Sequence, residues 1–170
     1  MQQIITLDDI HIRTELRSGD LTYVAYRHAR IYKEECDYGI PFESYVCAGL
    51  HEFYQQYNPD KDRVWVCEHQ DRIIGFLLLM HRAENAAQFR YFYLEPEYRG
   101  LGLGKRLMQY FMEALRVGQY ESAYLWTTDE QITAIALYER FGFRKTDEKA
   151  SDSFGRRVLE QRFELVINGL

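Results

Sequence analysis

The strongest signal in the sequence is the stretch Leu94-Glu95-Pro96-Glu97-Tyr98-Arg99-Gly100-Leu101-Gly102-Leu103-Gly104-Lys105. It follows a strand-like segment, residues 88–94, and precedes a segment whose apolar residues recur at helical spacing. A glycine-rich turn in that position presents backbone N–H groups and the positive end of a helix dipole, which suits a phosphate group. Glycine also lets an anion approach the backbone closely. We therefore predict that this loop binds a ligand, in preference to a tight turn without one.

Two familiar phosphate-binding motifs do not fit the spacing of this loop. A Walker A loop would need glycine at position 99 and serine or threonine at position 106, where the chain has Arg99 and Arg106. A dinucleotide fingerprint would need a third glycine at position 105 or 107, which hold lysine and leucine. Both classes of nucleotide site are thereby excluded.

Outward from the loop, hydrophobic periodicity predicts an α/β fold: a single domain with a mixed, mostly antiparallel sheet of about seven strands and about four helices. The expected helices are 20–36, about 42–57, the segment from the loop to Gly118, and one ending at Phe141 with Gly142 as its left-handed cap. Thr128 and Gln131 have capping-box spacing at the start of that last helix. The expected strands are 10–17, 63–69, 72–82, 88–94, 122–127, about 143–149 and 157–167.

Composition excludes several classes of function. The chain has 170 residues and a formal net charge of −5, which disfavours general nucleic-acid binding and argues weakly against anionic membranes. Its longest apolar run, residues 73–80, is far below the roughly 20 residues of a membrane span. The three cysteines and five histidines lack the spacing of a metal site, so we expect no metal. The first nine residues do not resemble a signal peptide, and we expect a cytoplasmic protein.

Two motifs together resemble the GNAT superfamily of acyl-CoA-dependent N-acetyltransferases. Arg99-x-x-Gly102-x-Gly104 is similar to its Arg/Gln-x-x-Gly-x-Gly/Ala signature, and residues 134–143 are similar to its Ala-x-x-Leu-Tyr-x-x-x-Gly-Phe segment. The resemblance covers roughly residues 10–167, so the whole chain, 1–170, is interpreted as one GNAT domain. The tail, residues 153–165, resembles the acetyltransferase half of fusions with MarR-type regulators.

The resemblance implies how acetyl-CoA is held. The pyrophosphate is expected on the backbone amides of residues 100–105, with Arg99 at the first position of the motif. The pantetheine arm is expected to pair with the preceding strand, and Gln131 stands where relatives often carry an asparagine. A free strand N–H could face the thioester oxygen as charge builds there. The expected cofactor-binding residues are Phe92, Tyr93, Leu94, Arg99, Gly100, Leu101, Gly102, Leu103, Gly104, Lys105 and Gln131.

The resemblance also implies the proton transfers. Tyr138 matches the family tyrosine that protonates the departing CoA thiolate. The strand position where some relatives carry a basic glutamate is Trp126 here, which cannot act as a base. Glu95, at the end of the strand near the thioester, is the first candidate general base. The other candidates are Glu97, Glu68 and Glu35.

The acceptor side is expected on the first two helices, with Tyr32 and Glu35 as candidate substrate-binding residues on a face shared with His28. A carboxylate and an aromatic ring would suit a cationic amine. The leading interpretation is an N-acetyltransferase acting on a small-molecule or peptide amine by direct attack. Alternatives are an acyl-CoA-binding regulatory module with little turnover, and an acyltransferase for longer acyl chains. The high aromatic content is compatible with a homodimer.

Overall fold

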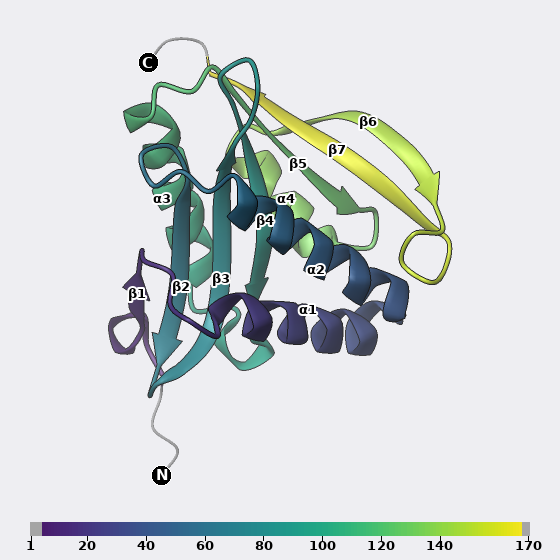
Figure 1. Cartoon of the computed structure of the whole chain (residues 1–170), viewed down its shortest axis with the longest axis horizontal. Coiled ribbons are helices and arrows are strands. Elements are labelled where there is room, and N and C mark those ends of the chain that lie inside the picture. The colour runs from purple at the N-terminus through teal and green to yellow at the C-terminus, as the bar shows by residue number, and fades with distance from the viewer. Residues whose placement is uncertain (1–4, 168–170) are drawn as a thin grey trace.

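A computed structural model describes residues 5–167, which form one seven-stranded sheet with four α-helices and two short 3-10 helices (Figure 1). The strand order is β1-β2-β3-β4-β5-β7-β6. The strands are β1 (His11–Arg13), β2 (Arg63–His69), β3 (Arg72–His81), β4 (Ala86–Leu94), β5 (Ser122–Thr128), β6 (Arg144–Ser151) and β7 (Val158–Val166). The helices are η1 (Leu7–Asp9), α1 (Asp20–Cys36), α2 (Ile40–Gln55), η2 (Pro96–Tyr98), α3 (Leu103–Val117) and α4 (Ile132–Arg140).

The sheet lies between two helical layers, with α1 and α2 on one face and α3 and α4 on the other (Figure 1). Each face has its own apolar core. Phe111 and Leu107 of α3 pack with Leu125 of β5 in one core, and Phe53 of α2 packs with Phe76 of β3 in the other. The predicted fold class, a mixed and mostly antiparallel seven-stranded sheet with four helices, is confirmed.

The first strand is shorter than the predicted segment 10–17, because Arg13 ends it. Its buried guanidinium forms paired bonds with Asp20 at 2.7 and 2.8 Å, a third with Glu68 at 2.8 Å and a fourth with the carbonyl of Glu15. These contacts turn the chain directly into α1. The second helix, in contrast, begins earlier than predicted, at Ile40, because Pro41 occupies the first turn, where proline is tolerated.

The central feature of the sheet is the separation of β4 from β5. These parallel strands pair only over residues 86–88 and 122–124. The pairing of β3 with β4 shifts register between Phe76 and Leu78 of β3. Tyr91 of β4 lies opposite this shift and has φ +56°, so β4 bulges there. The bulge places Arg90 and Tyr91 on the α2 side in succession, and β4 then diverges from β5.

The start of α4 differs from prediction. Gln131 is the N-cap, no capping box forms, and the hydroxyl of Thr128 instead lies 2.9 Å from that of Tyr38, 90 residues away in sequence. The predicted left-handed glycine at the other end is confirmed, since Gly142 has φ +93°.

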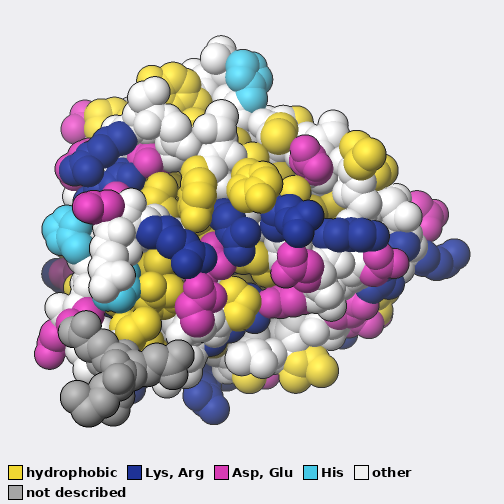
Figure 2. All heavy atoms as spheres, turned by 90° about the horizontal axis from the view of Figure 1, so that it is seen from below, with side chains coloured by type: hydrophobic (Ala, Val, Ile, Leu, Met, Phe, Trp, Pro, Cys, Tyr) yellow, Lys and Arg dark blue, Asp and Glu magenta, His cyan; other side chains and the backbone are white. Residues whose placement is uncertain are grey.

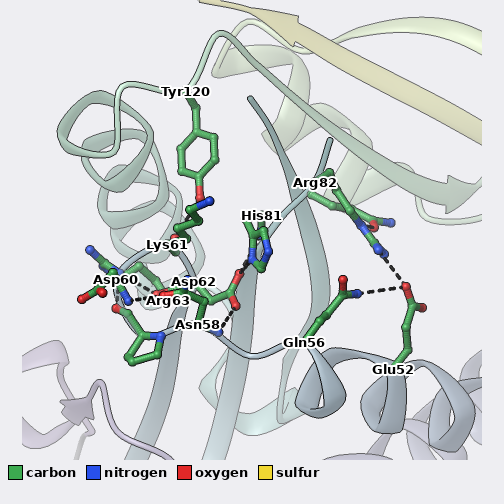
Figure 3. A network of polar contacts seen from close by, with 12 residues as sticks. Glu52, Gln56, Asn58, Asp60, Lys61, Asp62, Arg63, His81, Arg82 and Tyr120 are labelled. Carbon is green, nitrogen blue, oxygen red and sulfur yellow. Dashed lines mark hydrogen bonds and ion pairs between the residues drawn. The ribbon is translucent and has the colours of Figure 1, made fainter. Parts of the chain in front are cut away.

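A buried carboxylate fixes the connection between α2 and β2. Asp62 accepts from the backbone N–H groups of Asn58 and His81 and lies 2.8 Å from Nδ1 of His81 (Figure 3). In the same region Glu52 accepts hydrogen bonds from Arg82 and Gln56. The end of α2 is therefore tied to the end of β3. Among residues 5–167, no helix has the length and apolar character to cross a membrane.

Candidate functional site

The glycine loop turns the chain from β4 into α3. Gly100 and Gly102 have φ values of +78° and +90°, in the left-handed region that favours glycine. The first helical bond runs from Arg106 N–H to the Gly102 carbonyl. The amides of residues 103–105 precede that bond and so have no partner inside the helix. Their N–H groups and the helix dipole make the anion-binding geometry that the sequence predicts.

A cleft of about 120 Å³ opens where β4 and β5 separate. Residues 89–92 form one wall and residues 126–128 the other, while α1 and α2 contribute aromatic side chains. Beyond Gln88, β4 pairs with β3 on one edge only, within the described chain. Its other edge, which includes Phe92, Tyr93 and Leu94, has no strand partner among the described residues, so an extended ligand can pair with it.

Tyr138 of α4 lies in the wall of this cleft. Its ring packs edge-to-face against Phe89, Phe92 and Phe143, with centroid distances of 5.3 to 6.5 Å, and the residue is 5% exposed. Burial raises the pKa of the phenol above its usual value. Tyr138 is therefore protonated at neutral pH and has a proton to donate.

Three stacked rings form the opposite wall of the cleft. Tyr32 lies between His28 and Tyr38, with centroid distances of 5.8 and 5.6 Å. Burial lowers the pKa of His28 to about 4 and raises that of Tyr32 to about 12, so neither is charged at neutral pH. Nδ1 of His28 lies 2.9 Å from the Val24 carbonyl, where it donates in the neutral ring. This wall is uncharged and aromatic.

The four carboxylates considered as general bases lie outside the residues that line the cleft, and each is paired with arginine. Glu95, 1% exposed, accepts two bonds from Arg27 at 2.5 and 2.6 Å, and Arg72 lies 3.6 Å away. That pairing favours a structural role for Glu95 and argues against proton abstraction by it. The other three pairs are Glu97 with Arg72, Glu68 with Arg13, and Glu35 with Arg99. Figure 2 likewise shows basic and acidic side chains interspersed on the face seen from below.

The structure separates the two residues predicted for the acceptor side. Tyr32 lines the cleft, whereas Glu35 binds Arg99 at 2.7 Å and so connects α1 to the glycine loop. Gln131 lines the cleft and donates to Sγ of Cys36 at 3.2 Å. Sequence reasoning missed Arg90, which also lines the cleft, because the separation of β4 from β5 that exposes it gives no signal in the sequence.

Comparisons with known proteins agree with this architecture. Residues 60–145 match a family profile described as an acetyltransferase (GNAT) domain. Over 126 residues the chain is 32% identical to an uncharacterised N-acetyltransferase of Escherichia coli, YjgM, covering 70% of this chain and 75% of that protein. The chain also matches vertebrate N-acetylaspartate synthetases and N-acetyltransferase 8 proteins, but it spans only about half of their length or less.

Two solved structures share the fold. A GNAT-family acetyltransferase from Staphylococcus aureus has a TM-score of 0.76 at 20% identity, covering 94% of this chain and 99% of that one. Spermidine N-acetyltransferase from Vibrio cholerae, solved with CoA and spermine, has a TM-score of 0.67 at 22% identity, covering 94% and 96%.

Proposed function

The chain belongs to the GNAT family of acetyltransferases, and from that premise we propose that it transfers the acetyl group of acetyl-CoA to a primary amine by direct attack. The observation that supports this most is the cleft between β4 and β5, which has Tyr138 in its wall and follows the strand that leads into the glycine loop. Cleft and loop together suit a ligand with a phosphate at one end and a reactive thioester at the other.

Acetyl-CoA fits the groups that this chain presents. The amides of residues 100–105 hold the pyrophosphate, because those at the start of α3 have no helical partner and two glycines open the backbone. Arg99, whose Nε donates to the Leu94 carbonyl at 3.1 Å and whose Nη1 pairs with Glu35, stands beside the loop. The free edge of β4 at Phe92, Tyr93 and Leu94 pairs with the pantetheine arm, and Gln131 contacts the cofactor from the cleft wall.

The reaction needs two proton movements. The amine nitrogen forms a bond to the acetyl carbon and releases a proton to water, the carbon–sulfur bond breaks, and Tyr138 gives its proton to the departing thiolate and regains one from water. We assign no carboxylate as the base, since Glu95 and the other three candidates are paired with arginine. The amine therefore enters in its neutral form, and the rate rises with pH towards the pKa of the free amine. A backbone N–H on the free edge of β4 stabilises the charge on the thioester oxygen.

The names of the relatives suggest two classes of acceptor: a polyamine for spermidine N-acetyltransferase and an amino acid for N-acetylaspartate synthetase. A regulatory module that binds acyl-CoA without turnover is the alternative, suggested by Trp126 in place of a basic glutamate. A homodimer, a peptide acceptor and the likeness to MarR-type fusions stay predictions.

A thiol-release assay with acetyl-CoA and a panel of primary amines tests the proposal. We expect amine-dependent CoA release, with one acetylated amine formed for each thiol released. Tight acetyl-CoA binding without CoA release across the panel would favour the regulatory module instead. Measuring the pH dependence in the same assay tests whether the amine enters in its neutral form.

A further inference from the structure

A second cavity, of about 760 Å³, adjoins the cleft on the α2 side of the sheet. It is bounded by the end of α2, the β3–β4 turn, β5 and β7, and Trp126 lines both spaces. The helices leave this part of the sheet uncovered, and β6 and β7 extend past them (Figure 1). A molecule that enters the outer cavity therefore reaches the cleft beside Trp126.

Arg90 is the one charged side chain among the described residues that line the cleft. It is 12% exposed, and its nearest carboxylate oxygen, on Glu52, lies 3.6 Å away, beyond hydrogen-bond distance. Glu52 is itself half exposed and accepts hydrogen bonds from Arg82 and Gln56 (Figure 3). Within residues 5–167, no hydrogen bond holds the Arg90 guanidinium, which carries five N–H donors. Its guanidinium carbon lies 4.7 Å from the centroid of the Tyr91 ring, so that ring and Glu52 position the group, and within the described chain its N–H donors are left without a hydrogen bond, for an anion to accept.

A second arginine lies in the same row of the sheet. Gln88 of β4 is opposite Tyr124 of β5, so Arg90, two residues further on, lies across the gap from Trp126. Trp126 is opposite Arg162 of β7. Arg162 lines the outer cavity, and its Nε is buried without a partner among the described residues, although its Nη2 pairs with Glu164 at 2.5 Å. Arg90 and Arg162 thus stand in one row of the sheet with Trp126 between them, and the guanidinium carbon of Arg162 lies 4.6 Å from the centroid of the Tyr124 ring.

We propose that the acceptor is an amine that carries a carboxylate, of the α-amino acid class, and that Arg90 and Arg162 bind this carboxylate. The proposal rests on the acetyltransferase function above and names its acceptor. A guanidinium binds a carboxylate with paired, charge-assisted hydrogen bonds, stronger than those of neutral groups. The amino group is thereby directed into the cleft, and the aromatic rings of the wall receive an apolar side chain.

The same charges disfavour a polyamine. A polyamine brings additional ammonium groups, which Arg90 repels in the cleft, where the described lining contains no carboxylate; the carboxylates of Glu84 and Glu164 lie in the outer cavity instead. The cationic acceptor expected from Tyr32 with Glu35 loses its support, because Glu35 is paired with Arg99 outside the cleft. The acidic net charge of the whole chain therefore does not describe the charge at the acceptor site.

Matched pairs of amines test the carboxylate directly. Phenylalanine is compared with phenethylamine, and leucine with 3-methylbutylamine, since the members of each pair differ only in the carboxylate; phenylalaninamide and spermidine complete the panel. We expect kcat/KM to be at least about 10-fold higher for the amino acid of each pair, the range of a charge-assisted pair of hydrogen bonds. Arg90→Gln should remove this preference by raising KM for the amino acids, with little change for phenethylamine.

Arg116→Gln is the matched control, because Arg116 is an exposed arginine of α3 that pairs with Glu113. A second variant, Glu52→Gln, tests the opposite sign: it removes the carboxylate nearest to Arg90 and should lower KM for phenylalanine. Thermal unfolding and acetyl-CoA binding show whether each variant is folded, and Glu52→Gln still tests the proposal if Arg90→Gln is not.

Four outcomes would overturn the proposal. Equal turnover of the members of a pair, or a preference that survives both Arg90→Gln and Arg162→Gln, contradicts the carboxylate site and leaves acetyl transfer intact. Higher kcat/KM for spermidine than for the amino acids does the same. No acetylation of any amine contradicts the acetyltransferase function itself, and the inference falls with it.

Discussion

Replacing Tyr138 by phenylalanine removes the proton donor and leaves the ring. The edge-to-face contacts with Phe89, Phe92 and Phe143 involve only the ring, so they persist in the variant. No hydrogen bond from the Tyr138 hydroxyl to another described residue is lost. We therefore expect the free energy of unfolding to change by less than about 1 kcal/mol. Loss of a general acid lowers kcat by roughly 100-fold to 10,000-fold.

The assay for this variant combines steady-state CoA release, acetyl-CoA titration and thermal unfolding. Tyr120→Phe is the matched control, because Tyr120 is also buried but donates its hydroxyl to the Lys61 carbonyl at 2.9 Å. The control should lose about 1 kcal/mol of stability and keep its kcat. Tyr138→Phe should keep its stability and its acetyl-CoA affinity while losing kcat. An unchanged kcat in Tyr138→Phe would refute the assignment of the acid.

Three further changes have defined outcomes. Burial lowers the pKa of His28 to about 4, so as the pH falls the unfolded chain takes up a proton near pH 6.5 that the folded chain does not. The free energy of unfolding therefore decreases by about 2 kcal/mol between pH 7 and pH 5. Denaturant titrations of His28→Gln should show a smaller decrease over the same range. In Gly49→Ala, the new methyl group would lie 1.9 Å from Oη of Tyr91 and 2.7 Å from Nη2 of Arg90, so the free energy of unfolding should fall by about 1–3 kcal/mol. Urea unfolding should show this as a lower midpoint, and an unchanged midpoint would mean that α2 shifts freely. Gly102→Ala places a side chain on a residue with φ +90°, which should lower the free energy of unfolding by about 1 kcal/mol and weaken acetyl-CoA binding measured by calorimetry. Equal acetyl-CoA affinity in this variant would mean that binding does not depend on the loop conformation.

The elements that depend on local pattern could be predicted from the sequence. The apolar spacing of α3 and the glycines that precede and follow it define that helix without any tertiary information. Gly142 is at the predicted left-handed cap for the same reason, because only its own backbone is involved. The glycine loop between β4 and α3 is also a local feature, and the structure places it as predicted.

The features that depend on distant partners could not be predicted. The sequence makes Glu95 a candidate base, but Arg27, 68 residues away, holds it in a buried ion pair. Thr128 has the spacing of a capping box, yet its hydroxyl pairs with Tyr38. Tyr91 adopts a positive φ for which a tyrosine gives no sequence signal, and that bulge places Tyr91 on the same side of β4 as Arg90. The aromatic wall of the cleft and Arg90 were therefore less predictable than the glycine loop.

Calorimetric titration with acetyl-CoA, and with pantetheine as the fragment that lacks the phosphates, is the most direct test of the proposed cofactor site. We predict saturable binding of acetyl-CoA with a dissociation constant below about 1 mM, equivalent to about −4 kcal/mol or stronger, and no saturable binding of pantetheine. That difference would assign the binding energy to the phosphorylated half of the cofactor, which we place at Gly100 to Gly104. Equal binding of the two ligands would contradict the assignment of the loop, and no binding of acetyl-CoA at millimolar concentration would contradict the acetyltransferase function.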